Sequence, residues 1–65
     1  MIKALEILEL FFKEEGIENS EFIKATRYNE GEYKVIVKDE DNRYEYIVNI
    51  NSGNIYNDEG LRINI

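Results

Sequence analysis

Two segments near the middle of the chain alternate apolar and polar residues with the period of a β-strand. The first reads YKVIVK at 33–38 and the second reads YEYIVNI at 44–50, and each has Tyr, Val or Ile at every second position. β-Branched and aromatic residues at alternate positions are typical of strands with one buried face. The DEDN tetrapeptide between the segments suits a turn. Together they predict an antiparallel hairpin.

Charge predicts the register of this hairpin. Both apolar faces must point the same way, so the numbers of opposed residues sum to an odd value. A four-residue loop at 39–42 would set Lys38 against Arg43, whereas a two-residue turn at 41–42 sets Lys38 against Glu45. Opposite charges across such a pair contribute a few tenths of a kcal/mol up to ~1 kcal/mol, and like charges cost a similar amount. We therefore expect the two-residue turn.

The same register predicts a small patch on the face of the sheet that points away from the core. It sets Ile36 against Ile47, with Lys34 and Glu45 among the charged residues around them. An apolar centre inside a polar rim is the usual anatomy of a protein-binding surface. These four residues are therefore candidate partner-binding residues. The alternative is an ordinary solvent-exposed sheet face with one cross-strand pair.

The segment that precedes the strands, Ile2 to Glu15, is predicted to form an amphipathic helix. One stripe of this helix is apolar and consists of Ala4, Leu5, Leu8, Phe11 and Phe12. Gly16 suits the left-handed position just after the last turn. Leu10 departs from the pattern, because it projects on the polar side with Ile7 at its edge. Ile7 and Leu10 are therefore a second candidate contact surface, although a single exposed leucine is common on protein surfaces.

A further strand is expected at 22–28, ended by the turn residues NEG at 29–31. Two alternatives stay open for the face that it buries. A two-residue turn at 30–31 would bring one set of residues to the core: Phe22, Thr26 and Tyr28. A three-residue turn with Gly31 in a bulge would bring a different set there: Ile23 and Ala25.

The rest of the chain predicts short strands. After NSGN we expect a strand at 55–56, then a turn at NDEG, and then a final short strand that contains Leu61, Ile63 and Ile65. The whole chain, residues 1–65, is therefore predicted to be a single small α+β domain. Its N-terminal amphipathic helix packs on one face of an antiparallel meander sheet with three to five strands.

The chain has neither histidine nor cysteine. It therefore lacks the commonest general base, the best nucleophile and the commonest zinc ligands. The acidic turn DEDN does not fit a calcium-binding EF-hand loop, because Tyr44 stands where Gly is required and Ile50 where Glu is required. We expect no catalytic residue, no metal site and no cofactor, and the chain is not expected to be an enzyme.

Fourteen acidic residues against eight basic residues give a formal charge of −6. Such a surface repels phosphate backbones, so direct nucleic-acid binding is not expected, whereas a basic protein partner would be attracted. Glu6 and Glu9 interrupt the apolar run near the N-terminus, so neither a membrane span nor a signal peptide is expected. The sequence as written indicates a cytoplasmic location, and export is expected only if a signal peptide has been removed.

The segment YKVIVKDEDNRYEYIVNINSGNIYN, from Tyr33 to Asn57, resembles the PepSY domain, a small module named for its occurrence in peptidase propeptides. The family pattern is a strand Y-x-V-x-V, a turn, a second strand Y-x-V-x-V-D, a T-G pair and an apolar restart. Both strands fit it, the SG pair at 52–53 stands for T-G, and Ile55 restarts the apolar run. Asn42 replaces the turn glycine and Asn49 replaces the usual aspartate. The resemblance implies a preceding helix and a non-catalytic module that binds or restrains peptidases through its exposed sheet or sheet edge.

Two functions remain. The first is a PepSY-like protein-binding module that regulates or inhibits a partner protein such as a peptidase. The alternative is a small acidic intracellular inhibitor of the phage type, which mimics nucleic acid and blocks a nuclease or a defence complex with carboxylates in place of phosphates. A third interpretation is a homodimer built through sheet edges or through the surface formed by Ile7 and Leu10.

Overall fold

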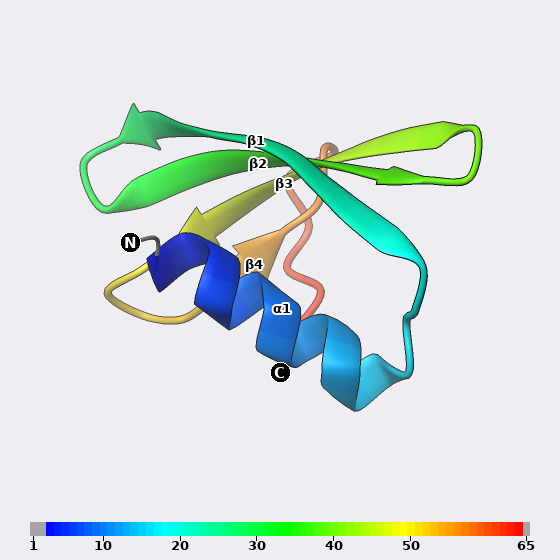
Figure 1. Cartoon of the computed structure of the whole chain (residues 1–65). Helices are drawn as coiled ribbons and strands as arrows, with labels where there is room; N and C mark the ends of the chain where they lie inside the picture. The colour runs from blue at the N-terminus through cyan, green and yellow to red at the C-terminus, as the bar shows by residue number, and fades with distance from the viewer. Residues whose placement is uncertain (1–2, 65) are drawn as a thin grey trace.

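The computed structural model describes residues 3–64. One helix precedes four strands: α1 (Lys3–Glu15), β1 (Ser20–Asn29), β2 (Glu32–Asp39), β3 (Asn42–Asn49) and β4 (Ile55–Tyr56). The strands form one antiparallel sheet in the order β1-β2-β3-β4, and α1 lies across one face of it (Figure 1). The predicted α+β fold with an N-terminal helix and a meander sheet is confirmed. The expected helix start at Ile2 and the expected strand residue Ile65 lie outside the described residues.

Helix α1 ends in a Schellman motif, as the position of Gly16 predicts. Gly16 has a φ of +73° and donates its N–H to the carbonyl of Lys13 at 3.2 Å. Ile17 donates its N–H to the carbonyl of Phe12 at 2.9 Å. These two bonds satisfy carbonyls that the helix end would otherwise leave free, and they turn the chain back toward the sheet. β1 therefore begins beside the last turn of α1.

The core fills the space between α1 and the centre of the sheet. Its buried members are Ala4, Leu8, Phe12, Val35, Val37, Val48 and Ile55. Phe12 is the one large aromatic among them: its ring stacks on Phe22 at 5.8 Å between centroids and meets Tyr46 edge-on at 5.6 Å. No polar or charged residue is buried among the described residues. Apolar burial and aromatic packing therefore hold the helix on the sheet.

A two-residue turn at Glu30 and Gly31 joins β1 to β2, with Asn29 opposite Glu32. Gly31 has a φ of +74°, and a Cβ atom there would lie 2.6 Å from the side-chain nitrogen of Asn51. Both the left-handed backbone and this close approach require glycine. Of the two turns left open by the sequence, the two-residue turn is the correct one.

Two bulges in β1 bring residues from both predicted sets to the core face. Tyr28 and Ile23 are the extra residues, since the register shifts between Arg27 and Asn29 and again between Phe22 and Lys24. Each bulge moves the alternation of the strand by one residue. As a result Phe22 and Ala25 both pack against the core, whereas Ile23 and Tyr28 are exposed.

The register predicted for the β2–β3 hairpin is wrong. Asp39 lies opposite Asn42 and Lys38 opposite Arg43, so the two turn residues are Glu40 and Asp41. The like charges of Lys38 and Arg43 are both exposed, and water and salt screen their repulsion. The observed register also allows an ion pair between Lys34 and Glu45, which lie diagonally across the two strands. The small charge preference on which the prediction rested is therefore outweighed.

The turn that follows β3 helps to explain this register. The side-chain oxygen of Asn49 accepts the N–H groups of Asn51 at 2.9 Å and Ser52 at 3.0 Å. Ile50 donates its N–H to the carbonyl of Gly31 at 2.9 Å. These bonds end β3 at Asn49, next to the start of β2, and a shift of the register would break the bond between Ile50 and Gly31. Asparagine and aspartate both supply the oxygen acceptor that this Asx turn needs.

The expected strand at the C-terminus is reduced to one bridge within the described residues. Arg62 pairs with Tyr56, and Ile63 donates its N–H to the carbonyl of Ile55 at 2.8 Å. The side chain of Asn64 adds two hydrogen bonds that hold this segment: it accepts the N–H of Ile55 at 2.7 Å and donates to the carbonyl of Gly53 at 2.8 Å. The C-terminal segment therefore shields the β4 edge of the sheet.

We expect Phe12→Ala to destabilise the domain by about 3–5 kcal/mol, because it removes the ring that joins α1 to β1 and β3. Phe11→Ala removes the same atoms from a half-buried neighbour, and its cost should be smaller by at least about 1 kcal/mol. Urea unfolding followed by circular dichroism measures both changes. Equal losses for the two variants would contradict the central place of Phe12.

Candidate protein-binding surfaces

The side of the sheet opposite α1 is called the outer face here. The registers place on it Glu21, Lys24 and Thr26 of β1, Glu32, Lys34, Ile36 and Lys38 of β2, Arg43, Glu45, Ile47 and Asn49 of β3, and Tyr56 of β4. Within residues 3–64 no helix or strand packs on it, and Figure 1 shows α1 on the other side alone. This face is therefore open to solvent or to a partner.

The isoleucine pair predicted for the outer face does not form as expected. Because the register differs from the prediction, Ile36 lies opposite Glu45 and Ile47 lies opposite Lys34. The two isoleucines are thus diagonal neighbours, and both are half-buried. The other diagonal of the same four residues is an ion pair, with Lys34 Nζ 3.5 Å from Glu45 Oε1. The four predicted residues do lie together, but the charged pair lies between the two isoleucines.

Tyr28 belongs to this surface, although the sequence analysis did not assign it. Its side chain is 58% exposed, and Lys34 Nζ lies 5.4 Å from the centre of its ring, within cation–π range. Tyr28 reaches this position because it is the extra residue of a bulge in β1. A bulge leaves no distinct trace in the sequence, so periodicity could not place the ring here.

Two shallow hollows flank the contact between Tyr28 and Lys34, and both of these residues line each one. The first, of about 250 Å³, adjoins Ile47 and is closed on its far side by the turn at 57–60. The second, also of about 250 Å³, adjoins Ile36 and Lys24. The outer face therefore offers two places where an apolar or aromatic side chain of a partner could rest.

The helix surface predicted from Ile7 and Leu10 is only partly exposed. Leu10 is 59% exposed, whereas Ile7 packs against the core. Both line a hollow of about 480 Å³ between α1 and the C-terminal segment, together with Phe11 and Ile63. This hollow is a second candidate surface, and it lies away from the outer face.

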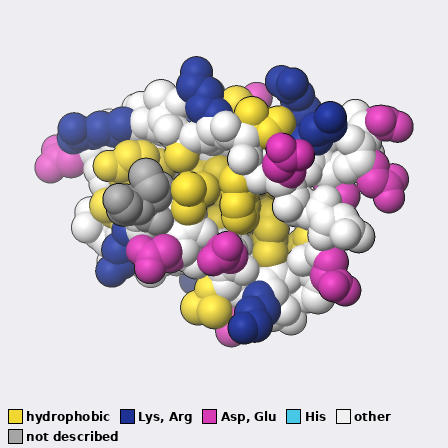
Figure 2. Space-filling model, viewed as in Figure 1, with side chains coloured by type: hydrophobic (Ala, Val, Ile, Leu, Met, Phe, Trp, Pro, Cys, Tyr) yellow, Lys and Arg dark blue, Asp and Glu magenta, His cyan; other side chains and the backbone are white. Residues whose placement is uncertain are grey.

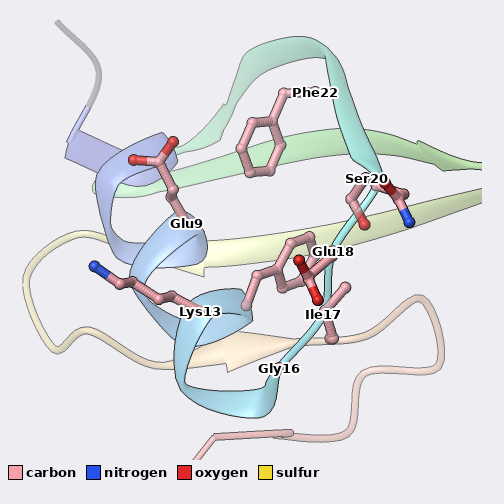
Figure 3. Close-up of a pocket in the computed structure, with 9 residues that line it drawn as sticks. Glu9, Lys13, Gly16, Ile17, Glu18, Ser20 and Phe22 are labelled. Atoms are coloured by element: carbon pink, nitrogen blue, oxygen red, sulfur yellow. The ribbon is translucent and has the colours of Figure 1, made fainter.

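A fourth hollow, of about 470 Å³, opens between the end of α1 and the start of β1. Figure 3 shows Phe22 pointing from β1 into it, with Ile17 on the opposite side. Its floor is apolar and includes Phe12, and Glu9, Lys13 and Glu18 lie around it. The sequence analysis missed this hollow because it depends on how the Schellman turn and the bulge at Ile23 bring α1 and β1 together.

Charge is divided unevenly between the two sides of the molecule. The outer-face positions of β1–β3 hold four basic residues, Lys24, Lys34, Lys38 and Arg43, and only three of the fourteen acidic ones. Glutamates are concentrated instead on α1 and in the loop that follows it: Glu6, Glu9, Glu14, Glu15 and Glu18. In Figure 2 most of the dark blue side chains lie along the sheet, while the magenta ones are spread more widely, over the helix and at both ends of the sheet. A partner would therefore meet different electrostatics on the two sides.

Within residues 3–64, no cluster of three or more metal-ligating side chains could hold a metal ion. None of the helical structure described is both long enough and apolar enough to cross a membrane.

Comparison with known proteins identifies no relative: no protein-family model, no curated protein and no solved structure matches this chain.

Tyr46, which is partly buried and packs against the core beside Phe12, couples the stability of the domain to pH. Burial is the main cause that raises the pKa of its hydroxyl above 10.0, and the negative charges of Tyr44, Asp39 and Asp58 add to it. The folded state then holds the proton more tightly than the unfolded state. The stability from this group is fully present below pH 10 and is lost as the pH rises through the folded-state pKa.

We therefore expect the free energy of unfolding to fall between about pH 9 and about pH 11, and to fall less in Tyr46→Phe. Tyr28→Phe is the matched control, because it removes the same hydroxyl from an exposed ring. Urea titrations at the two pH values measure the difference. If both variants show the fall of the unaltered chain, Tyr46 is not its source.

Proposed function

We propose that this chain is a non-catalytic protein-binding module that contacts its partner through the outer face of the sheet. The observation that carries the proposal is the asymmetry of the sheet. Helix α1 covers one face, whereas no helix or strand in residues 3–64 covers the other, which carries Ile36, Ile47 and the exposed ring of Tyr28.

The make-up of the outer face supports this role. Tyrosine is enriched at the energetic centres of interfaces, because one rigid ring supplies large contact area together with a polar end. Tyr28 has this form, and the hollows on either side of it adjoin Ile36 and Ile47. Lys34 and Glu45 would lie within the contact area. Their mutual ion pair would limit the cost of removing their charges from water.

The resemblance to the PepSY domain supplies a class of partner. On this proposal the chain regulates or inhibits a peptidase, and it takes no part in the chemistry itself. The excess of basic residues on the outer face favours a peptidase surface that is acidic where the module docks.

A second candidate function is favoured by the glutamates of α1. An acidic inhibitor that mimics nucleic acid needs a row of exposed carboxylates, and Glu6, Glu9, Glu14 and Glu15 are all exposed. Such an inhibitor would use the helix side and would leave the outer face free. The two proposals therefore assign opposite sides of the molecule to the partner, so variants on each side can separate them.

The test begins with capture of the partner from the native host on the immobilised chain, and the purified partner is then titrated with variants. Ile47→Asp should weaken binding about tenfold or more, because it places a charge where apolar area is buried in the complex. Leu10→Asp introduces the same charge at an exposed position on α1 and should leave binding unchanged. Isothermal titration at two salt concentrations measures both variants.

The acidic-mimic alternative predicts the reverse pattern. Binding would fall steeply with salt and would weaken when Glu6, Glu9 and Glu14 are changed to glutamine, while Ile47→Asp would have little effect. Loss of binding in Leu10→Asp alone would instead indicate the hollow between α1 and the C-terminal segment. Either result would contradict the outer-face proposal.

A further inference from the structure

β1 is the long unprotected edge of the sheet. Eight of its ten residues pair with β2 on one side, and among the described residues no strand pairs with the other side. The opposite edge, β4, has only two residues and is bridged by the C-terminal segment at Arg62. An open edge presents free N–H and C=O groups to any strand that can match it. The question is which strand matches β1.

The first half of β1 is complementary to itself in the antiparallel direction. Residues 20–25 read SEFIKA. When this segment is laid against a second copy so that opposed residue numbers sum to 45, Glu21 meets Lys24 and Phe22 meets Ile23. Ser20 meets Ala25 at the outer ends. Acidic residues thus oppose basic ones, apolar residues oppose apolar ones, and small residues oppose small ones.

The bulge at Ile23 makes this pairing geometrically consistent. In a regular strand, residues three apart point to opposite faces, so Glu21 and Lys24 could not both lie on one side. Here Glu21 lies opposite Lys38 and Lys24 lies opposite Ile36, and both of these β2 residues are on the outer face. Because the bulge shifts the alternation, Glu21 and Lys24 share the outer face. Glu21 of one copy could therefore pair with Lys24 of a second copy across a two-fold axis perpendicular to the sheet.

We propose that two copies of this chain associate through their β1 edges, with Glu21 of each opposite Lys24 of the other. The axis passes between Phe22 and Ile23, and the two four-stranded sheets become one continuous sheet. Ile23 is 43% exposed in the single chain and becomes covered at the centre of the interface. Helix α1 packs mainly on β2 and β3 and meets β1 through the stacking of Phe12 on Phe22, on the core face of the sheet, and no strand among the described residues occupies the open edge of β1.

Charge favours this register over two alternatives. Centring the axis on Lys24 would bring two lysines together, and centring it on Glu21 would bring two glutamates together. Like charges directly opposite each other destabilise a strand pair. In the register in which opposed residue numbers sum to 45, Glu21 and Lys24 each lie opposite the other's charge. The two-fold symmetry of the dimer forms this Glu21–Lys24 pair twice. The interface also lies beside the hollow between α1 and β1, since Ser20 and Phe22 line both.

A charge swap within β1 tests the proposal by sedimentation equilibrium over a range of protein concentrations. Glu21→Lys would set lysine against Lys24, and Lys24→Glu would set glutamate against Glu21. Each change replaces two favourable pairs by two repulsive ones and should raise the dimer dissociation constant at least about tenfold. The double variant Glu21→Lys/Lys24→Glu restores opposite charges and should restore the dimer. Glu59→Lys, an exposed change in the turn beyond β4, is the matched control.

Circular dichroism melts check that each variant is folded, since both positions are exposed. A chain that stays monomeric up to millimolar concentration would overturn the proposal. So would a dimer that withstands either single charge reversal, or one that the double variant fails to restore. Ile47→Asp should leave the dimer intact, so failure of this proposal and failure of the outer-face proposal give different results.

Discussion

The packing of Phe12 between Phe22 and Tyr46 is the interaction on which the arrangement of this molecule depends. It is the point where the last turn of α1, the start of β1 and the middle of β3 meet. Because no polar or charged residue is buried among the described residues, no network of side-chain hydrogen bonds inside the core supplements this contact. A chain of this size buries only about 60% of its surface on folding, so a single aromatic cluster can decide where the helix lies. Because α1 packs on one face of the sheet, the outer face is left without a helix.

The bulge at Ile23 links that core to the edge of the sheet. It allows Phe22 to reach Phe12 while Ala25, three residues later, still faces the core. The same shift places Glu21 and Lys24 together on the outer face. Bulges often protect an edge strand from pairing with other chains, because they disturb the alternation that a partner strand would have to match. In the proposed dimer, the second copy of β1 has the same bulge at the position related by the two-fold axis, so the alternation of the two strands matches. The bulge therefore favours pairing with another copy of β1 over pairing with an unrelated strand.

The sequence predicts those parts of the fold that depend on local periodicity and on single residues with special conformations. The helix stripe, the end of α1 at Gly16 and the two central strands are of this kind. The register of β2 and β3 could not be predicted from the charge of Lys38, because a preference of a few tenths of a kcal/mol is weaker than the turn at Asn49 and its bond to Gly31. Tyr28 was missed for a related reason, since bulges arise from tertiary packing and leave no periodic signal. The four residues predicted for the outer face do lie together there, but they pair differently from the prediction, and their contact with a partner stays a prediction.

The two proposals reinforce each other through geometry. A two-fold axis perpendicular to the sheet keeps both outer faces on the same side of a dimer and both helices on the other. Two copies of the surface around Tyr28 and Ile47 would then face a partner together. If the partner is itself paired or presents two sites at a matching distance, the second contact forms within one complex, and its effective concentration can reach the millimolar range. A small domain with shallow hollows could in this way bind more tightly than one of its faces would allow.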